Sequence, residues 1–484
     1  MSMAECPFTP PYPVPPARKP GLLLRFMLGW GSWVHTLFAG AYTMKLGHTR
    51  LPRLSVFMVN ELPLVRRVLG GDAFPKHGLL SDMLGPLVGS SVFSANGAEW
   101  RRQRAMVNPA FVHANLARAF PMMLAAADEM VARLRCAAKR GPVCIDPLMT
   151  HVTADIIFRT LFSVPLDEKG ARTIHAAFER YQRHAQRSAV LGLYRLPRLG
   201  FGWRAQRAAR DIRAVFEPLV HRRLAQGAGG KACGQADLLD ALIAARDGEG
   251  GQPFTPGELV DQIAVLFLAG HETSASALAW TLYLLAASPA WQDKARAAVR
   301  EAFGDGPPDH ATLKTIQPLR NIFREALRLY PPVSFLPRAS AVPVILRDKP
   351  VAPQDLLIVA PWLIHRNPDH WPCPHAFDPD RFSREEEAQA VRHAWLPFGQ
   401  GERLCVGAGF AMQEAMIVLA RVVQQVALEP VGTPEVVSRL TLRARRGIHL
   451  RVRALSDPPQ GGGVCHDLAQ ANAQGAAGHD VGGA

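Results

Sequence analysis

The sequence predicts a mainly α protein with a small β region late in the chain, built as one compact domain. Helical periodicity covers most of residues 98–246 and again about 30 residues after Thr255. Runs of β type are short, and they are concentrated within residues 341–359 and 438–453. No internal repeat divides the 484 residues into similar parts.

The first 45 residues are predicted to form a proline-rich and amphipathic segment ahead of the main domain. Residues 21–42 are apolar and aromatic, but Arg25 and His35 interrupt them. A transmembrane helix requires about 20 mostly uninterrupted apolar residues, which this stretch lacks. It is therefore expected to lie on a membrane surface or line a substrate entrance, or else to pack as a helix on the protein's own core.

The first half of the main domain is predicted to be helical after a short β section. Residues 50–70 alternate in a way that indicates short strands followed by a helix. Glycine-rich loops at residues 227–234 and 247–253 separate later helical segments. The predicted helices cover residues 98–140, 150–165, 170–190, 204–225 and 237–246.

A long helix is predicted from Thr255 to about Ala287. Thr255 is a favourable N-cap, Pro256 suits the first helical position, and Glu258 completes the start signal. A helix of this length is about 45 Å long, and its apolar circumference indicates burial at the centre of the domain. The polar residues Glu272 and Thr273 inside it then require a chemical or structural reason.

The last third of the chain is predicted to contain the β region and one more apolar helix. A coil rich in proline, histidine and aspartate runs to Phe382 after the first β section. An apolar helix is expected from Cys405 to about Val426. Residues 456–484 contain mostly Gly, Ala, Gln and Asp and are predicted to be a disordered tail.

Charge and cysteine content limit the possible partners and compartments. Lys and Arg number 55 against 41 Asp and Glu, which gives a net charge of +14. The positive charge is scattered, so nucleic-acid binding is disfavoured and an acidic electron-transfer partner fits better. The seven cysteines contain no C-x-x-C pair, which predicts free thiols in a reducing compartment.

The run from Phe398 to Gly407 carries the strongest chemical signal. It places Cys405 in a glycine-rich turn, two residues after Arg403, where a helix is expected to begin. A helix N-terminus and backbone N–H groups lower the pKa of a thiol, so the turn predicts an ionised thiolate that binds a metal. The alternative is a buried structural cysteine, which is the usual role of a lone cysteine.

Other arginines are candidates for binding the carboxylates of a cofactor. Trp100 and Arg104 are four residues apart and share one helical face, while Arg338 follows a proline in extended chain. A guanidinium group binds a carboxylate through two parallel charge-assisted bonds. Each arginine alone is more often a solvated surface residue, so the prediction rests on the set.

Two further motifs combine acids with basic or hydroxyl groups. Glu325 and Arg328 lie three residues apart on a predicted helix and are expected to form an ion pair, the commonest of surface motifs. Within Ala269–Ser274, the pair Glu272 and Thr273 suits a proton relay, and Thr273 can bond to the carbonyl four residues earlier. The alternative for this run is a kinked helix whose polar groups are all hydrogen-bonded.

Together these motifs resemble the cytochrome P450 superfamily of haem-thiolate monooxygenases. Their order along the chain also agrees, from residue 46 to residue 455. The resemblance implies a triangular helix-rich body with a long central helix and a minor β lobe, forming a single domain over residues 46–455. The matching patterns are W-x-x-x-R at 100–104, A-G-x-E-T-S at 269–274, E-x-x-R at 325–328, P-R at 337–338 and F-x-x-G-x-R-x-C-x-G at 398–407.

The resemblance also implies a role for each motif. Cys405 would be the axial ligand of the haem iron, and Glu272 and Thr273 would deliver protons during oxygen activation. Glu325, Arg328 and Arg381 would form a buried ion triad. The remaining cofactor-binding residues would be Trp100, Arg104, Arg338, Phe398, Arg403 and Gly407.

The implied reaction inserts one atom of O2 into a hydrophobic substrate such as a fatty acid, terpenoid or steroid-like molecule. Electrons from NAD(P)H would arrive through a ferredoxin or flavodoxin with its reductase, because no such segment is fused to the chain. The implied location is cytoplasmic, with possible peripheral membrane contact through residues 21–42. The substrate pocket would be lined by residues 77–93, Val265, Leu266, Ala269, Gly270, Val333, Phe335 and Leu336.

Two other functions remain open at this stage. A peroxygenase or isomerase with the same fold would need no external electrons, but the acid–threonine pair disfavours it. A haem-binding sensor or carrier would need neither a proton relay nor an apolar pocket.

Overall fold

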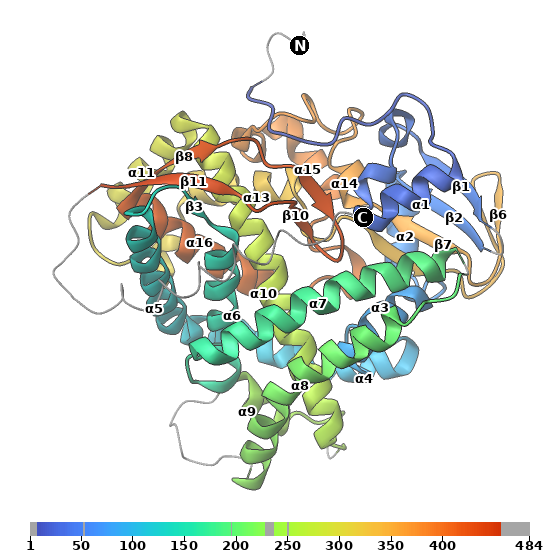
Figure 1. Cartoon of the computed structure of the whole chain (residues 1–484), viewed down its shortest axis with the longest axis horizontal. Helices are drawn as coiled ribbons and strands as arrows, with labels where there is room; N and C mark the ends of the chain where they lie inside the picture. Colours follow the sequence, from blue (N-terminus) through green and yellow to red (C-terminus); the bar gives the residue numbers. More distant parts are fainter. Residues whose placement is uncertain (1–6, 52–53, 195, 228–236, 249–250, 456–484) are drawn as a thin grey trace.

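The computed structural model describes residues 7–51, 54–194, 196–227, 237–248 and 251–455 (Figure 1). The predicted tail at residues 456–484 lies outside the described residues. Helices form most of the body, and small sheets lie at its upper and right-hand margins in Figure 1. The mainly α prediction is therefore confirmed.

The central helix is α10, Pro256–Ala287. The Thr255 side chain accepts from the Glu258 N–H, and the Glu258 side chain accepts from the Thr255 N–H, so the predicted start is a complete capping box. Helices α6, α8, α13 and α16 pack around α10, and α7 crosses in front of it in Figure 1. Because nearly all of its side chains are buried, α10 can carry polar groups into the interior only where they find partners.

The other helices form the rest of the body. The pair α7 and α8 packs closely over one side of the body, and α5 and α16 pack together on another. Their bounds are α1 Leu22–Gly31, α2 Leu62–Gly70, α3 Gly78–Val88, α4 Gly97–Val107, α5 His113–Ala138, α6 Asp146–Phe162, α7 Glu168–Leu193, α8 Phe201–Ala225, α9 Leu238–Ala244, α11 Pro289–Phe303, α12 His310–Leu313, α13 Gln317–Leu329, α14 Pro361–Ile364, α15 Ala388–Ala394 and α16 Ala408–Gln425.

The largest sheet has the strand order β1-β2-β7-β4 and lies beside α1 in Figure 1. Strands β2 and β7 are parallel, and the other neighbours are antiparallel. A second sheet has the order β3-β11-β8, and two hairpins pair β5 with β6 and β9 with β10. The strands are β1 Leu46–Leu51, β2 Leu54–Val59, β3 Val143–Cys144, β4 Leu336–Ala339, β5 Val344–Leu346, β6 Lys349–Val351, β7 Leu356–Val359, β8 Val426–Val431, β9 Val436–Ser438, β10 Leu442–Ala444 and β11 His449–Ala454.

Hydrophobic burial divides between a large helical core and a smaller core under the main sheet. The helical core contains the buried faces of α5, α6, α10, α13 and α16. The smaller core contains Phe57 and Val59 of β2 and Leu357 and Val359 of β7.

Helix α10 is also the helix among the described residues that is long and apolar enough to cross a membrane. Its most apolar window is 83% buried inside the protein, so α10 is a core helix. Residues 21–42 contain the ten-residue helix α1, too short to span a bilayer, followed by two short 3-10 turns.

The prediction of free thiols is wrong for two cysteines. Cys136 and Cys373 are disulfide-bonded, whereas Cys144 and Cys405 are free. Irregular sequence spacing could not reveal these bonds, because a disulfide depends on which cysteines the fold brings within about 6 Å of each other.

Candidate active site

The loop that carries Cys405 is folded tightly against α2. The Cys405 N–H donates to the Phe398 carbonyl at 3.0 Å, which closes the loop. Gly401 has a φ of +76°, and a Cβ there would lie 2.9 Å from the Leu69 carbonyl oxygen. Only glycine tolerates both this backbone conformation and this close approach, so Gly401 is a requirement of the turn.

Cys405 lies three residues before α16, with its free thiol accessible on one side and enclosed by protein on the others. Burial raises the pKa of the thiol, and the Gly407 N–H and Arg104 lower it less. The expectation that the turn by itself lowers this pKa is therefore wrong, because desolvation disfavours the thiolate. A bound metal cation would reverse this balance, since coordination deprotonates a thiol.

Four cations converge next to this loop: Lys76, Arg104 of α4, Arg338 of β4 and Arg403. We call them the cation cluster. The Arg403 guanidinium lies 4.2 Å from the centre of the Trp100 ring and donates to the Ala95 carbonyl at 3.0 Å. The structure thus brings together the predicted residues Trp100, Arg104, Arg338 and Arg403, which the chain separates by up to 303 positions (from Trp100 to Arg403).

The cation cluster has no internal counter-charge. Among the described residues, no carboxylate forms an ion pair with any of its four members. Burial lowers the pKa of Arg338 to about 10, and repulsion from Arg403 lowers it further. Burial also holds the pKa of Lys76 well below its ordinary value, with Arg338, Arg403 and Arg104 adding to the effect. Keeping these cations buried and unpaired lowers the stability of the fold, so the cluster is expected to bind an anionic ligand.

The thiol and the cation cluster together fit haem. In the described part of the chain no three His, Cys, Asp or Glu side chains gather as metal ligands, so a metal bound by Cys405 needs its other ligands from a cofactor. Haem supplies four ring nitrogens, and its two carboxylates match the charge of the cation cluster. Phe398 is partly buried beside Trp395, and Gly407 adds no side chain in front of α16.

On α10, the run Ala269–Ser274 faces an apolar cavity of about 260 Å³. The Thr273 hydroxyl donates to the Ala269 carbonyl at 2.6 Å, as predicted, and the helix remains continuous there. Thr273 lines the cavity, so its oxygen can still accept a hydrogen bond from a bound molecule. Gly270 does not line the cavity and faces α6 instead, where a Cβ on it would be 3.1 Å from Ile157.

Glu272 lines the same cavity but is held in an ion pair. Its carboxylate accepts from Arg443 at 2.7 Å, from Thr441 at 2.6 Å and from Gln182 at 2.8 Å. Burial raises the pKa of Glu272, but Arg443 and the other donors outweigh burial and hold it below its ordinary value. Glu272 is therefore ionised at neutral pH, with its carboxylate bound by Arg443.

The cavity confirms part of the predicted pocket. It is lined by the predicted Val265, Ala269, Val333 and Phe335, and by Leu79, Leu80, Met83, Leu84 and Phe93 from the segment 77–93. Leu266 packs into the helical core instead, because one residue along a helix turns the side chain by about 100°, and Gly270 faces Ile157 of α6. Leu336 packs into the smaller core.

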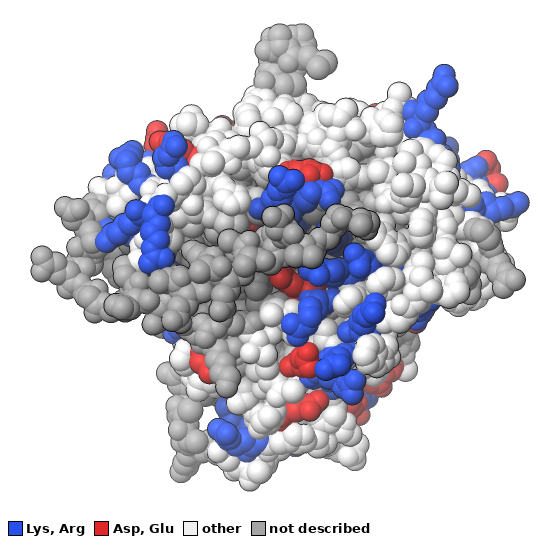
Figure 2. All heavy atoms as spheres, in the orientation of Figure 1, with Lys and Arg blue, Asp and Glu red and all other residues white. Residues whose placement is uncertain are grey.

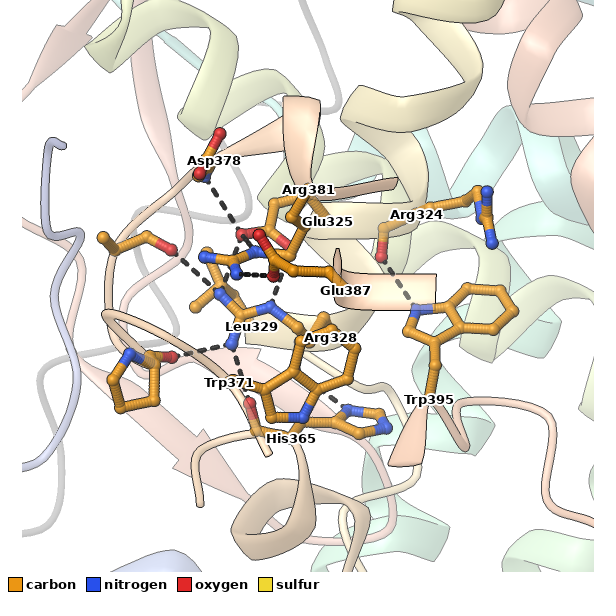
Figure 3. Close-up of polar contacts among 12 residues, drawn as sticks. Arg324, Glu325, Arg328, Leu329, His365, Trp371, Asp378, Arg381, Glu387 and Trp395 are labelled. Atoms are coloured by element: carbon orange, nitrogen blue, oxygen red, sulfur yellow. Dashed lines mark hydrogen bonds and ion pairs between the residues drawn. The ribbon is translucent and has the colours of Figure 1, made fainter. Parts of the chain in front are cut away.

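The predicted ion triad is fully buried and extended by one further acid (Figure 3). Glu325 accepts from Arg328 at 2.7 Å and from Arg381 at 3.0 Å, and Arg381 also pairs with Glu387 at 2.5 Å. We call these four residues the ion-pair cluster. Arg328 donates to the carbonyls of His365, Pro374 and Ala376, so the cluster fixes the coil ahead of the Cys405 loop to α13.

Three contributors were missed at the level of sequence. Lys76 stands in no motif, and Glu387 follows two other glutamates that look like a solvated run. Arg443 lies 171 residues from its partner Glu272. The excess of arginine near residues 439–446 was the only hint of a buried partner for an acid on α10.

The comparisons with known proteins agree with this geometry. The sequence model of the family described as Cytochrome P450 matches residues 33–448. Two Streptomyces melanosporofaciens proteins are each 30% identical to the chain. Cyclooctatin synthase aligns over 79% of this chain and 82% of its own length, and cyclooctat-9-en-7-ol 5-monooxygenase over 80% and 83%.

The fold has a solved counterpart as well. The crystal structure of the cytochrome P450DA heme domain superposes with a TM-score of 0.74 at 23% identity, covering 85% of this chain and 90% of that one. Human cytochrome P450 4F2 is 29% identical over 81% of this chain and 80% of its own length. The chain belongs to the cytochrome P450 family and is a haem-dependent monooxygenase.

Proposed function

We propose that the chain hydroxylates a hydrophobic substrate bound beside Thr273, using O2 and electrons that originate from NAD(P)H. The observation that carries the proposal is the position of the apolar cavity on the α10 side of the site, with the free thiol and the cation cluster completing the site. A flat cofactor with two negative charges, bound between the apolar cavity and the cation cluster, would account for both features.

The chain's own residues would hold that cofactor in place. Cys405 would bind the iron, while Arg104, Arg338, Arg403 and Lys76 would pair with the two carboxylates, and Trp100 would support Arg403 through its ring. Haem ligated by a thiolate supplies the oxygen-activating chemistry, since the ligand's electron density favours O–O cleavage. The protein contributes orientation and the exclusion of water.

Thr273 and Glu272 are proposed to move the protons. Thr273 is the hydroxyl of α10 that faces the cavity, and its proton is held by the Ala269 carbonyl. Glu272 lies next to it and can take part only when Arg443 releases its carboxylate. The ion pair would thus act as a gate between bulk water and the cavity.

The substrate is proposed to be apolar over most of its surface, in the range of fatty acids, terpenoids and steroid-like molecules. Leucine, valine, methionine and phenylalanine side chains form most of the lining. The names of the two Streptomyces relatives refer to cyclooctatin and cyclooctat-9-en-7-ol, and this chain would accept a molecule of comparably apolar character.

Electron delivery is proposed to come from a ferredoxin or flavodoxin with its reductase. Helix α2 packs against the Cys405 loop and presents the exposed cations Arg66 and Arg67, while Leu404 is 44% exposed in the loop itself. An apolar contact surrounded by cations suits an acidic protein. Elsewhere on the surface, Figure 2 shows arginines and lysines mixed with acids. Turnover that does not depend on ionic strength would contradict this docking mode.

The location is proposed to be cytoplasmic with peripheral membrane contact through residues 21–42. Helix α1 exposes Leu22, Leu23, Leu24 and Met27, and Leu199 and Trp203 are exposed at the start of α8. The ring of Trp30 packs against Phe201, which places the two apolar patches side by side. Such a surface suits the boundary of a bilayer.

The proposal is tested first by the spectrum of the reduced protein with carbon monoxide. We expect the strongly red-shifted Soret band of a thiolate-ligated haem in the parent and its loss in Cys405→Ala. A band typical of histidine ligation in the parent would contradict the assignment of Cys405.

The proton role is tested by peroxide release per NAD(P)H consumed. Thr273→Ala should release more peroxide, whereas Thr273→Ser keeps the hydroxyl and should stay near the parent. Equal release in all three proteins would show that Thr273 carries no proton. Full turnover with peroxide alone, without redox proteins, would favour a peroxygenase.

A further inference from the structure

The cavity beside Thr273 contains two arginines that its apolar lining does not explain. Arg25 of α1 and Arg439, in the turn between β9 and β10, both line it. One carboxylate belongs to the lining, that of Glu272, and Arg443 already neutralises it. Within the described residues, the wall of the cavity therefore carries an excess of positive charge.

Arg25 is half-buried and only partly hydrogen-bonded. Its Nη1 donates to the Thr49 hydroxyl at 3.1 Å, and no carboxylate of the described residues forms an ion pair with it. Burial lowers the pKa of Arg25, and the nearby Tyr194 raises it less. A guanidinium has five N–H donors, so most of the hydrogen-bonding capacity of Arg25 remains available.

Arg439 is exposed and lines the same cavity. Its Nε is 3.5 Å from the Gly31 carbonyl, the last residue of α1, which is the helix that carries Arg25. Partial burial lowers the pKa of Arg439, and the neighbouring Arg445, Arg183 and Arg187 lower it further, while Glu179 raises it less. Arg445 is paired with Glu435 at 2.8 Å, whereas no described carboxylate is paired with Arg439.

The two ends of the cavity differ in character. Thr273 and Ala269 belong to the centre of α10, while Arg25 belongs to α1 and Arg439 to the hairpin turn that contacts the last residue of α1. The walls between them are apolar, with Leu79, Leu80, Met83 and Leu193 among the lining residues. A molecule that fits both ends is an amphiphile with one anionic end.

We propose that Arg25 and Arg439 bind the carboxylate of an amphiphilic substrate and direct its apolar end toward Thr273. This inference rests on the proposed function and narrows it to substrates with an acidic group remote from the oxidised carbon. A charge-assisted pair in a partly buried site discriminates against the uncharged analogue, because the arginines then remain unpaired.

The test is a ligand titration of the ferric holoprotein, followed by the shift of the Soret band. The probes are dodecanoate, 1-dodecanol and methyl dodecanoate, which share a chain length and differ at one end. The parent should bind dodecanoate about tenfold more tightly than either neutral probe, the effect of one charge-assisted hydrogen bond. High salt should reduce this preference.

The variants are Arg25→Gln, Arg439→Gln and the double substitution, with Arg18→Gln as the matched control. Arg18 is exposed just ahead of α1 and does not line the cavity, so its substitution removes the same charge from the same region. The double variant should bind acid and alcohol equally, through loss of acid affinity, whereas Arg18→Gln should keep the preference of the parent.

Three results would overturn the inference. These are equal binding of acid and alcohol by the parent, an acid preference that survives in the double variant, and a loss of preference in Arg18→Gln as large as in the double variant. Loss of binding to anionic lipid vesicles with an intact acid preference would assign the arginines to a membrane surface instead. Throughout, the carbon monoxide spectrum of each variant must remain that of a thiolate-ligated haem, so that failure here is distinct from failure of the proposed function.

Discussion

The ion-pair cluster and the cation cluster contain similar side chains but differ in counter-charge. In the ion-pair cluster, Arg328 and Arg381 are 0% and 1% exposed in their side chains and meet two carboxylates of the chain itself (Figure 3). In the cation cluster, four cations gather beside Cys405 and no described carboxylate is paired with them. The first cluster is complete in the polypeptide, and the second becomes complete only with a ligand.

This difference separates a structural role from a binding role. A buried charge without a partner costs several kcal/mol, so a chain that leaves cations unpaired in its interior gives up stability unless something binds them. The pKa values agree with this view, because burial lowers those of Arg338 and Arg403 to about 10. Repulsion from a neighbouring arginine adds to this in both, and the attraction of Arg403 to Asp72 and Glu402 does not offset its burial. Removing a charge should therefore have opposite consequences in the two clusters.

The largest effect is expected in the ion-pair cluster. Glu325→Gln leaves Arg328 buried without its bidentate partner, and we expect a loss of about 3–5 kcal/mol in the free energy of unfolding. Denaturant unfolding with and without haem measures it. The loss should be similar in both forms, and a variant as stable as the parent would contradict the structural role of the cluster.

A second prediction concerns a buried carboxyl that has no cation. Glu414 of α16 is 1% exposed, Ser274 is its polar neighbour, and neither carboxyl oxygen makes a well-aligned hydrogen bond. Burial raises its pKa from 4.5 to about 8, so the folded state retains a proton that the unfolded chain releases. The stability that Glu414 contributes is present below about pH 4.5 and is lost as the pH rises through 8.

Glu414→Gln should therefore gain stability relative to the parent as the pH rises from 5 to 9, by about 4 kcal/mol. Thermal unfolding at both pH values measures the difference, and exposed Glu386→Gln is the control. A difference that does not change with pH would mean that Glu414 is paired after all.

In the cation cluster, removing a charge is expected to have a smaller effect on the free energy of unfolding, and one of opposite sign. Arg338→Gln removes one of four mutually repelling charges, so the haem-free protein should be at least as stable as the parent. Haem should dissociate about tenfold faster, because one charge-assisted pair with a carboxylate is lost. Transfer of haem to a scavenger protein measures the rate, and an unchanged rate would remove Arg338 from the site.

The smallest effect is expected at the surface pair Arg101–Asp72. The two side chains are 53% and 71% exposed, although Arg101 is on the same helix as Arg104. Arg101→Gln should change the free energy of unfolding by about 0.5 kcal/mol or less and leave haem dissociation unchanged. A large effect on haem would mean that general surface charge, and not the cation cluster, retains the cofactor.

Several parts of the fold and of the site could be predicted from the sequence, because they depend on residues close together in the chain. The capping residues Thr255 and Glu258 determine where α10 begins, and glycines on both sides of Cys405 mark the turn. Glu325 and Arg328 are three residues apart, so their pairing needs only a helix. Helix α3 has no such start signal and was not predicted, and α11 was not predicted although Ser288 and Pro289 stand at its start.

The remainder depends on contacts between distant segments. Arg443 reaches Glu272 from a late hairpin, Lys76 reaches the cation cluster from a loop before α3, and Arg25 and Arg439, more than 400 positions apart (25 to 439), line one cavity. Each of these residues looks like a solvated cation in the sequence. Whether a cation lies next to a carboxylate depends on the tertiary fold, and the two clusters differ in this respect: among the described residues, the cations of the ion-pair cluster have carboxylate partners and those of the cation cluster do not.

The most direct measurement compares haem with its dimethyl ester, in which both carboxylates are blocked. Binding of each to haem-free parent, Arg338→Gln and Arg101→Gln would be measured by the Soret band. We predict that the parent and Arg101→Gln strongly prefer haem, and that Arg338→Gln shows a smaller preference through weaker binding of haem alone. Equal binding of haem and its ester by the parent would contradict the claim that the cation cluster exists to hold the cofactor's carboxylates.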